Sequence, residues 1–288
     1  MTDQDWRALA SGIGLVASDL DGTLLRPDAT VSPFTVSTLA RARAAGLPVV
    51  FVTGRPPRWI PPIARATGHA GVGIGANGGV VVDLVSGDVL DSHPIPHGVL
   101  DEVVATLRAE VPGIGFAVEW VAATRDEGTG TCFAYESTFR TRFPIDLPAT
   151  LGDVRGFSRG HRVVKLLARV EDSGHDADGF LDLAVSHVAH LVTATRSNAD
   201  DVLLEMSAYG VSKGSTLAAL ATSLGVGRGA VAAMGDMPND VPMLEWAGVG
   251  LGVASAHAAV RTAADAVLPD PDHDGVALFV EAVLDARG

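Results

Sequence analysis

The stretch VASDLDGTLL, residues 16–25, places Asp19 and Asp21 one residue apart, where an apolar run ends and Gly22 begins a turn. An apolar run of this kind predicts a buried strand. Two carboxylates held so close at its end repel each other, and partial burial increases the repulsion. The chain must therefore fold so that a cation lies between them, or so that one of them keeps a proton.

The composition excludes several classes of partner. The chain has 288 residues and a net charge of -13, so it lacks the basic surface that nucleic acids and anionic membranes require. Cys132 is the single cysteine, which excludes an internal disulfide and a cysteine-based zinc site. The start MTDQDWRALASG has no signal-peptide pattern, and no apolar run is long enough to span a bilayer. We therefore expect a cytoplasmic protein, and the sequence carries no signal for its oligomeric state.

Lysine is rare in this chain. Of the 21 basic residues, Lys165 and Lys213 are lysines and all the others are arginines. Lysine carries a compact point charge on a flexible stem, whereas arginine presents a planar fork of donors. A lysine kept in such an arginine-rich sequence therefore indicates a position where a point charge is needed.

The first 82 residues alternate apolar runs with helical stretches. GLVAS (14–18), the start of LPVVFVTGR (47–55) and the start of VGIGANGG (72–79) are predicted strands, and PFTVSTLARARAAG (33–46) is a predicted helix. Buried apolar strands that alternate with helices are typical of a parallel α/β sheet.

The same alternation returns after residue 207. Leu217, Leu220, Ala221 and Leu224 follow the spacing of an amphipathic helix, and Ser212 is placed to cap its N-terminus. Further predicted elements are the strands GAVAAMGD, VGLGVA and ADAVLP, the helix SAHAAVRTAA and the closing helix GVALFVEAVLDA. We therefore assign 1–82 and 207–288 to one Rossmann-like α/β domain.

The middle of the chain, 83–206, has a different pattern. The turn Ser86-Gly87-Asp88 lies between two strand-like runs, as in a hairpin. Predicted strands follow in GFAVEW, HRVVKLLARV, HLVTATR and DVLLEM, with helices in DEVVATLRAE and DADGFLDLAVSHVAH. Runs of strands with segregated helices indicate an α+β domain inserted into the α/β domain.

Polar groups follow several predicted strands of the α/β domain. Ligands of open α/β sheets bind beyond the carboxyl ends of their strands. The groups at such ends are Asp19, Asp21, Thr53, Asp236, Asn239 and Asp240, and Lys213 lies in the first turn of a helix. We expect these side chains to meet at one edge of the sheet.

Each of these residue types suits phosphoryl transfer. A carboxylate can attack phosphorus and form an aspartyl phosphate, and a second carboxyl group can protonate the leaving oxygen. A hydroxyl and an ammonium can stabilise the charge on the phosphoryl oxygens. Clustered carboxylates are the hard oxygen ligands that Mg²⁺ prefers, and a bound Mg²⁺ would offset the repulsion between Asp19 and Asp21.

The motifs DLDGTL, VTGR, SKG and GDMPND, in that order, resemble those of the haloacid dehalogenase (HAD) superfamily of phosphohydrolases. The place of the insert, after ANGG (76–79) and before the lysine of SKG, is similar to that of the type IIB cap of Cof-type sugar phosphatases. The resemblance implies a phosphatase of small phosphorylated metabolites, with sugar phosphates as the expected substrates. It also implies Mg²⁺ as cofactor and a cap that selects the substrate.

The resemblance assigns a role to each matching residue. Asp19 corresponds to the nucleophile and Asp21 to the general acid and base. Thr53 and Lys213 correspond to the phosphoryl-binding pair and complete the implied catalytic set. The implied metal-site residues are Asp19, Asp21, Asp236, Asn239 and Asp240. The candidate substrate-binding residues are Thr53, Gly54, Arg55, Asn77 and Lys213.

Two other functions use the same residues. A phosphomutase or phosphotransferase of sugar phosphates would share the catalytic set, and a binding protein could keep the fold without turnover. Asp21 supplies the acid that expels an alcohol, which favours phosphatase or mutase chemistry.

Some residues allow two interpretations. Asn77 either faces the site or serves only as a turn residue beside Gly78, and Arg55 reaches either the phosphate or the cap. Trp59 either contacts the substrate or packs. The segment 270–281 fits an EF-hand loop, but prolines and the predicted helix there favour Asp274 as a helix cap over a calcium ligand.

Overall fold

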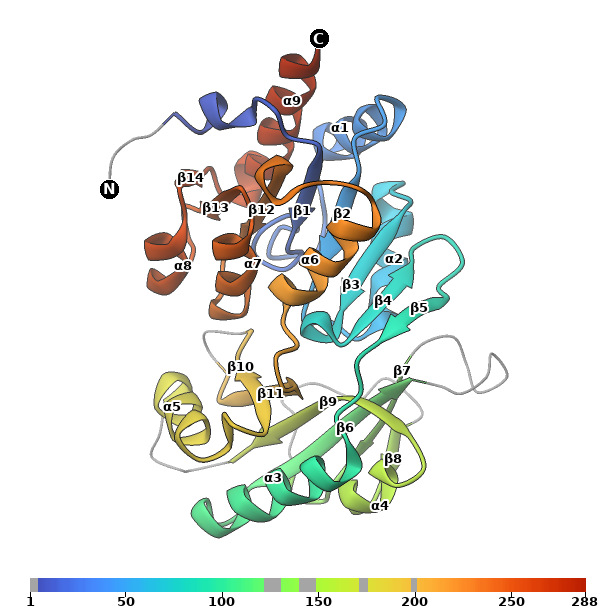
Figure 1. Ribbon diagram of the computed structural model, residues 1–288, viewed down its shortest axis with the longest axis vertical. Coiled ribbons are helices and arrows are strands. Elements are labelled where there is room, and N and C mark those ends of the chain that lie inside the picture. The colour runs from blue at the N-terminus through green and yellow to red at the C-terminus, as the bar shows by residue number, and fades with distance from the viewer. Residues whose placement is uncertain (1–4, 122–130, 140–148, 171–175, 198–200) are drawn as a thin grey trace.

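The computed structural model describes residues 5–121, 131–139, 149–170, 176–197 and 201–288. Within these residues the strands form two sheets, one of eight strands and one of six. Figure 1 shows the larger sheet in the upper half of the molecule and the smaller one below it.

The larger sheet carries the two ends of the chain. Its strands, in spatial order, are β14 (Ala266–Leu268), β13 (Val249–Val253), β12 (Val231–Gly235), β1 (Leu15–Ser18), β2 (Val49–Val52), β3 (Val72–Gly75), β4 (Val80–Asp83) and β5 (Val89–Ser92). The first six run parallel, with β1 between β12 and β2. The predicted parallel α/β sheet is therefore confirmed.

Helices cover both faces of this sheet because its strands are apolar on both sides. Val16 of β1 belongs to a core shared with α1 (Pro33–Ala44), α2 (Ile60–Thr67) and α9 (Gly275–Arg287). Its neighbours Leu15 and Ala17 point the other way, as the two-residue period of a strand requires, into a core shared with α6, α7 and α8. These helices span Lys213–Ser223, Val241–Trp246 and Ala258–Ala263.

The predicted helix after residue 212 is confirmed as α6. Ser212 caps it through a reciprocal pair of hydrogen bonds with Ser215. Leu217 and Ala221 are buried, whereas Leu224 is 47% exposed because the helix ends at Ser223. The apolar stripe therefore stops one turn earlier than its spacing predicts.

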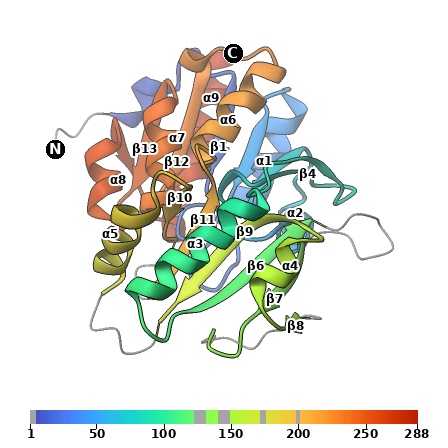
Figure 2. The same ribbon diagram turned by 60° about the horizontal axis from the view of Figure 1, so that its bottom comes forward.

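Among the described residues, the smaller sheet has helices packed on one face. Its strands are, in order, β10 (Val192–Thr195), β11 (Leu203–Ala208), β9 (Arg162–Arg169), β6 (Gly115–Val121), β7 (Thr131–Tyr135) and β8 (Ala149–Leu151). The helices α3 (His97–Glu110), α4 (Val154–Ser158) and α5 (Ala177–Val188) pack on the face turned away from the larger sheet, as Figures 1 and 2 show. This is the α+β arrangement expected for the insert.

The predicted hairpin belongs to the larger sheet. β3 and β4 pair antiparallel, since the short 3₁₀ turn Ala76–Gly78 reverses the chain, and β5 pairs with β4. The strand 89–92 thus extends the α/β sheet, and the strand β11 ends the smaller sheet at Ala208. We propose domain boundaries on this basis, with an inserted cap from about residue 93 to 208 in place of 83–206.

The helices of the described segments are all too short or too polar to cross a lipid bilayer.

Candidate active site

The first acidic motif follows β1 at the carboxyl edge of the larger sheet. The amide of Asp19 still pairs with the neighbouring strand, donating to the carbonyl of Met234 at 2.9 Å. Asp19 is 4% exposed, whereas Asp21 is in solvent contact. Gly22 has a φ of +75°, and a Cβ there would lie 2.3 Å from Oδ2 of Asp236. Glycine is thus required both for the turn and for the close approach of the second acidic segment.

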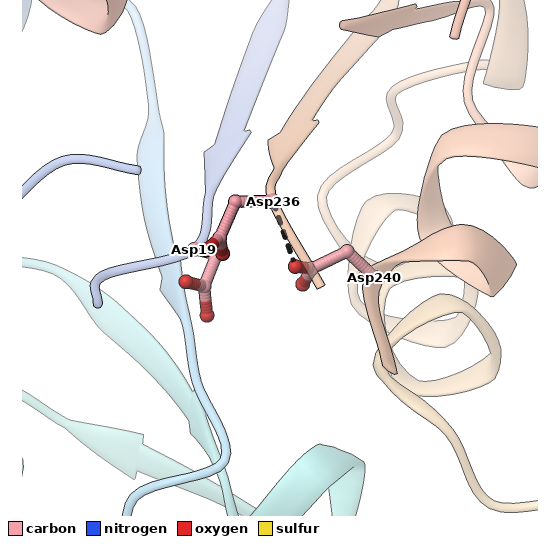
Figure 3. A group of neighbouring side chains, drawn as sticks. All are labelled: Asp19, Asp236 and Asp240. Atoms are coloured by element: carbon pink, nitrogen blue, oxygen red, sulfur yellow. Dashed lines mark hydrogen bonds between the residues drawn. The ribbon is translucent and has the colours of Figure 1, made fainter. Parts of the chain in front are cut away.

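The strand β12 brings a second pair of carboxylates to the same place. Carboxylate oxygens of Asp19, Asp236 and Asp240 all lie within 4.8 Å of one another. Figure 3 shows these three side chains converging from the ends of β1 and β12 and from the turn that follows β12. Oδ2 of Asp240 accepts hydrogen bonds from the Asp236 and Met237 amides, each at 3.0 Å, which fixes the turn.

The three carboxylates repel one another, and two of them, Asp19 and Asp240, are buried. Burial raises the pKa of Asp19 well above its ordinary value, and the charges of Asp240 and Asp236 add to the increase. Burial and Asp240 likewise raise the pKa of Asp236 to about 7. The cluster therefore favours a bound positive charge.

Lys213 supplies part of that charge. Its Nζ donates to Asp19 Oδ1 and to Asp240 Oδ1, each at 2.6 Å, and the side chain is 1% exposed. Burial by itself would lower the pKa of Lys213, but the two carboxylates outweigh it and raise this pKa above its ordinary value. The lysine is thus a fixed cation beside Asp19.

The loop after β2 holds Thr53, Gly54 and Arg55. Oγ1 of Thr53 accepts from the Arg55 amide at 3.0 Å, which leaves the hydroxyl proton free to be donated elsewhere. The guanidinium of Arg55 binds Asp21 with two hydrogen bonds, one of them from Nε to Oδ2 at 2.6 Å. This pairing with Asp21 raises the pKa of Arg55.

Asn77 has both of the properties that its sequence context suggests. Its backbone is left-handed, with a φ of 56°, so it does form the turn. Its buried side chain also takes part in the site, because Nδ2 donates to Glu205 and Oδ1 accepts from Asn239 Nδ2 at 3.0 Å. Trp59, in contrast, is 47% exposed, with the Arg58 guanidinium 5.2 Å from its ring centroid.

The cap adds a buried ion pair that the sequence motifs do not indicate. Nζ of Lys165, on β9, lies 2.7 Å from Oε2 of Glu205, on β11, and also donates to the Gly54 carbonyl at 2.7 Å. The rarity of lysine singles out Lys165, but its partner depends on the register of the cap sheet. Glu205 lies within the segment LLEMSAYGVSKG, which separates it from Lys213 by seven residues.

The donor set fits a hard divalent cation. Three carboxylates lie together with a single ammonium, so negative charge remains to be balanced. Asn239 Oδ1 is a buried oxygen without a hydrogen-bond partner among the residues that the structure describes. Carboxylate and amide oxygens are the ligands and water-binding groups that Mg²⁺ uses.

The EF-hand pattern of 270–281 does not form a loop of free carboxylates. Asp270 accepts from the Ser255 amide at 2.7 Å, Asp274 accepts from Thr35 Oγ1 at 3.1 Å, and Glu281 accepts from Thr38 Oγ1 at 2.6 Å. The prediction that Asp274 caps α9 is wrong for its side chain, which makes no capping bond. Its left-handed backbone turns the carboxylate toward the Thr35 hydroxyl instead.

The family follows from a match over most of the chain. Residues 16–280 match the family model of haloacid dehalogenase-like hydrolases. The chain belongs to this family, and it is a hydrolase of phosphoric monoesters, as its curated relatives are named.

The relatives span nearly the whole chain. The pyridoxal phosphate phosphatase YbhA of Escherichia coli is 29% identical and covers 92% of this chain and 97% of its own length. The phosphatase YwpJ of Bacillus subtilis is 28% identical, with coverage of 94% and 99%. A phosphoglycolate phosphatase of Natronomonas pharaonis is 29% identical, with coverage of 94% and 97%.

Solved structures show the same fold. The HAD phosphatase BT1666 from Bacteroides thetaiotaomicron has a TM-score of 0.72 at 22% identity, and the two chains are covered to 94% and 95%. The HAD subclass IIB sugar phosphatase BT4131 has a TM-score of 0.73 at 18% identity, with coverage of 93% and 97%. These likenesses confirm a HAD fold with a cap domain.

Proposed function

We propose that the protein is a Mg²⁺-dependent phosphatase of small phosphorylated metabolites that works through an aspartyl phosphate. The observation that carries the proposal is the convergence of Asp19, Asp236, Asp240 and Lys213 at one sheet edge. Asp21 follows Asp19 in the same turn, and Thr53 follows the neighbouring strand β2. When bound, Mg²⁺ would be held by Asp19, Asp236 and the Asp21 carbonyl and would balance charge on the transferring phosphoryl group.

In the first step, an oxygen of the Asp19 carboxylate attacks phosphorus. A bond forms between this oxygen and phosphorus, and the ester bond between phosphorus and the leaving oxygen breaks. Asp21 gives its proton to that leaving oxygen, so the alcohol departs neutral. Lys213 holds the carboxylate of Asp19 in place, and the Thr53 hydroxyl can donate a hydrogen bond to a phosphoryl oxygen.

In the second step, Asp21 takes a proton from a water molecule that attacks phosphorus. The bond between Asp19 and phosphorus breaks, inorganic phosphate leaves, and both carboxyl groups return to their starting states. Asp21 suits this double role because its side chain is 52% exposed and can meet both alcohol and water. The hydrogen bonds of Arg55 orient Asp21 between the two steps.

Sugar phosphates are the proposed substrates, and the relatives' names add pyridoxal phosphate and phosphoglycolate as candidates. The test is a phosphate-release screen over these compounds with Mg²⁺, repeated in EDTA. We expect release with Mg²⁺, loss of activity in EDTA and recovery on adding Mg²⁺ back. Transfer of phosphate between positions of a hexose phosphate, without release, would support a mutase instead. Full activity in EDTA would contradict the metal requirement.

A further inference from the structure

The buried ion pair of Lys165 and Glu205 occupies a position that a contribution to stability alone does not explain. The two side chains are 4% and 5% exposed. A buried ion pair often contributes less than apolar side chains of the same size, because both charges lose their hydration. This pair lies at the contact between cap and core, where Lys165 donates to the Gly54 carbonyl. Its position points to a task in the site.

Glu205 acts only as a hydrogen-bond acceptor. Burial by itself would raise the pKa of Glu205, but Lys165 and the hydrogen bonds from Ser197 and Asn77 outweigh it and bring this pKa below its ordinary value. Ser197 donates to Oε1, and Asn77 Nδ2 donates to Oε2. An ionised carboxylate has no proton to offer, so every neighbour must turn a donor toward it.

This requirement sets the orientation of two amides in succession. Asn77 must turn its NH₂ group toward Glu205, which leaves its Oδ1 for Asn239. Asn239 must then turn its own NH₂ group toward Asn77, at 3.0 Å. The last polar atom in this series of hydrogen bonds is Asn239 Oδ1, the buried oxygen without a hydrogen-bond partner in the described structure. The Glu205 carboxylate in the cap thus determines which atom of Asn239, in the core, remains without a hydrogen-bond partner.

The chain of contacts is packed too tightly to rearrange freely. Gly54 lies so close that a Cβ on it would be 3.0 Å from Asn77 Oδ1 and 3.4 Å from Glu205 Oε2. Asn77 is 3% exposed and Asn239 is 4% exposed. Flipping Asn77 would place its NH₂ group against that of Asn239, and flipping Asn239 would place two oxygen atoms against each other.

We propose that Glu205, paired with Lys165, is a positioning residue that orients the amides of Asn77 and Asn239, so that the carbonyl oxygen of Asn239 is available to a hydrated divalent cation. A flipped Asn239 would offer NH₂ to the cation instead and repel it. Because Glu205 lies in the cap and Asn239 in the core, the orientation is imposed only while the two are in contact. This inference rests on the metal site of the proposed function.

The test uses Mn²⁺ as a substitute for Mg²⁺ and measures its binding by electron paramagnetic resonance. The first variant is Lys165→Met/Glu205→Met, which replaces the ion pair with apolar side chains of similar size. The matched control is Arg169→Met/Asp201→Met, because this pair is also buried in the cap, at 9% exposure of each side chain. We expect Mn²⁺ affinity to fall about tenfold in the first variant and by less than about twofold in the control.

Two further variants separate orientation from general damage. Glu205→Gln keeps an acceptor oxygen for Asn77, so we expect it to restore most of the Mn²⁺ affinity. Asn77→Gly removes the amide but keeps the left-handed backbone, so it should lose affinity even if the double variant fails to fold.

Each outcome decides the inference. Unchanged affinity in Lys165→Met/Glu205→Met or Asn77→Gly overturns the positioning role and leaves the proposed phosphatase intact. An equal loss in the control overturns it as well, because the effect would then come from any damage to the cap. If the unaltered protein binds no Mn²⁺, the metal site of the proposed function fails together with the inference.

Discussion

The two lysines of the chain are both buried, yet their surroundings differ in charge. Lys213 lies between Asp19 and Asp240, with Asp236 close by, so that three carboxylates face one ammonium. Lys165 faces one carboxylate, Glu205, and a backbone carbonyl. The cap pair is balanced in charge, whereas the core cluster is short of positive charge. A balanced pair can orient its neighbours, and an unbalanced cluster can bind a cation.

The largest expected effect is that of removing the attacking carboxylate from the core cluster. Asp19→Asn should lower kcat by at least about 10⁴-fold, because an amide oxygen cannot form the aspartyl phosphate. The measurement is steady-state phosphate release, with the melting temperature as the check on folding. Asp201→Asn, which alters a cap carboxylate outside the site, should retain activity. Near-normal turnover in Asp19→Asn would rule out the proposed chemistry.

The next effect compares the two lysines directly. Lys213→Met should lower kcat by about 10³-fold and the free energy of unfolding by about 3–5 kcal/mol, because it leaves two buried carboxylates without their cation. Lys165→Met should cost less stability, since Glu205 keeps its donors Ser197 and Asn77. Urea unfolding of both variants measures the difference. Equal losses would contradict the contrast in charge balance.

The smallest expected effect is on the pH dependence of stability, to which Asp236 and Glu205 should contribute with opposite signs. The pKa of Asp236 is raised to about 7 in the folded protein, so the folded state binds more protons than the unfolded chain between about pH 4 and 7. The stability of the metal-free protein should therefore fall by up to a few kcal/mol as the pH rises through this range. Asp236→Asn should flatten this slope.

Glu205 should show the opposite sign. Its pKa is lowered in the folded protein, so its contribution to stability is present above its unfolded pKa of about 4.3 and is lost as the pH falls through the folded value. Urea unfolding in EDTA, repeated from acid to neutral pH with Glu205→Gln for comparison, measures the free energy of unfolding across both pH ranges. A metal-free protein whose stability rises from pH 5 to 7 would contradict the raised pKa of Asp236.

Most of the fold could be predicted because its strands are apolar runs that end in turns. The carboxyl ends of parallel strands meet at one edge, so the meeting of Asp19 with Asp236 followed from their positions alone. Lys213 was predicted for a similar reason, since the first turn of α6 points toward that edge.

The remaining features depend on pairings between distant segments. The contact of Lys165 with Glu205 requires the register of β9 and β11, and their contact with Gly54 requires the cap to fold back on the core. The partner of Arg55 is also nonlocal, because Asp21 lies on a different loop. The hairpin 80–92 joined the larger sheet because the turn at Asn77 aims β4 along β3.

The cap leaves and re-enters the core at neighbouring points. His93, just after β5, donates its amide to the Gly79 carbonyl at 2.8 Å, and the carbonyl of Ser212 lies so close to Gly78 that a Cβ there would be 2.3 Å away. An insertion whose two junctions adjoin can be exchanged as one cassette during recombination without breaking the sheet that received it. On the proposed role of Glu205, a transplanted cassette would retain the orientation of Asn77 only if it carried its own acceptor at the position of Glu205, and the metal site would then restrict which caps a given core accepts.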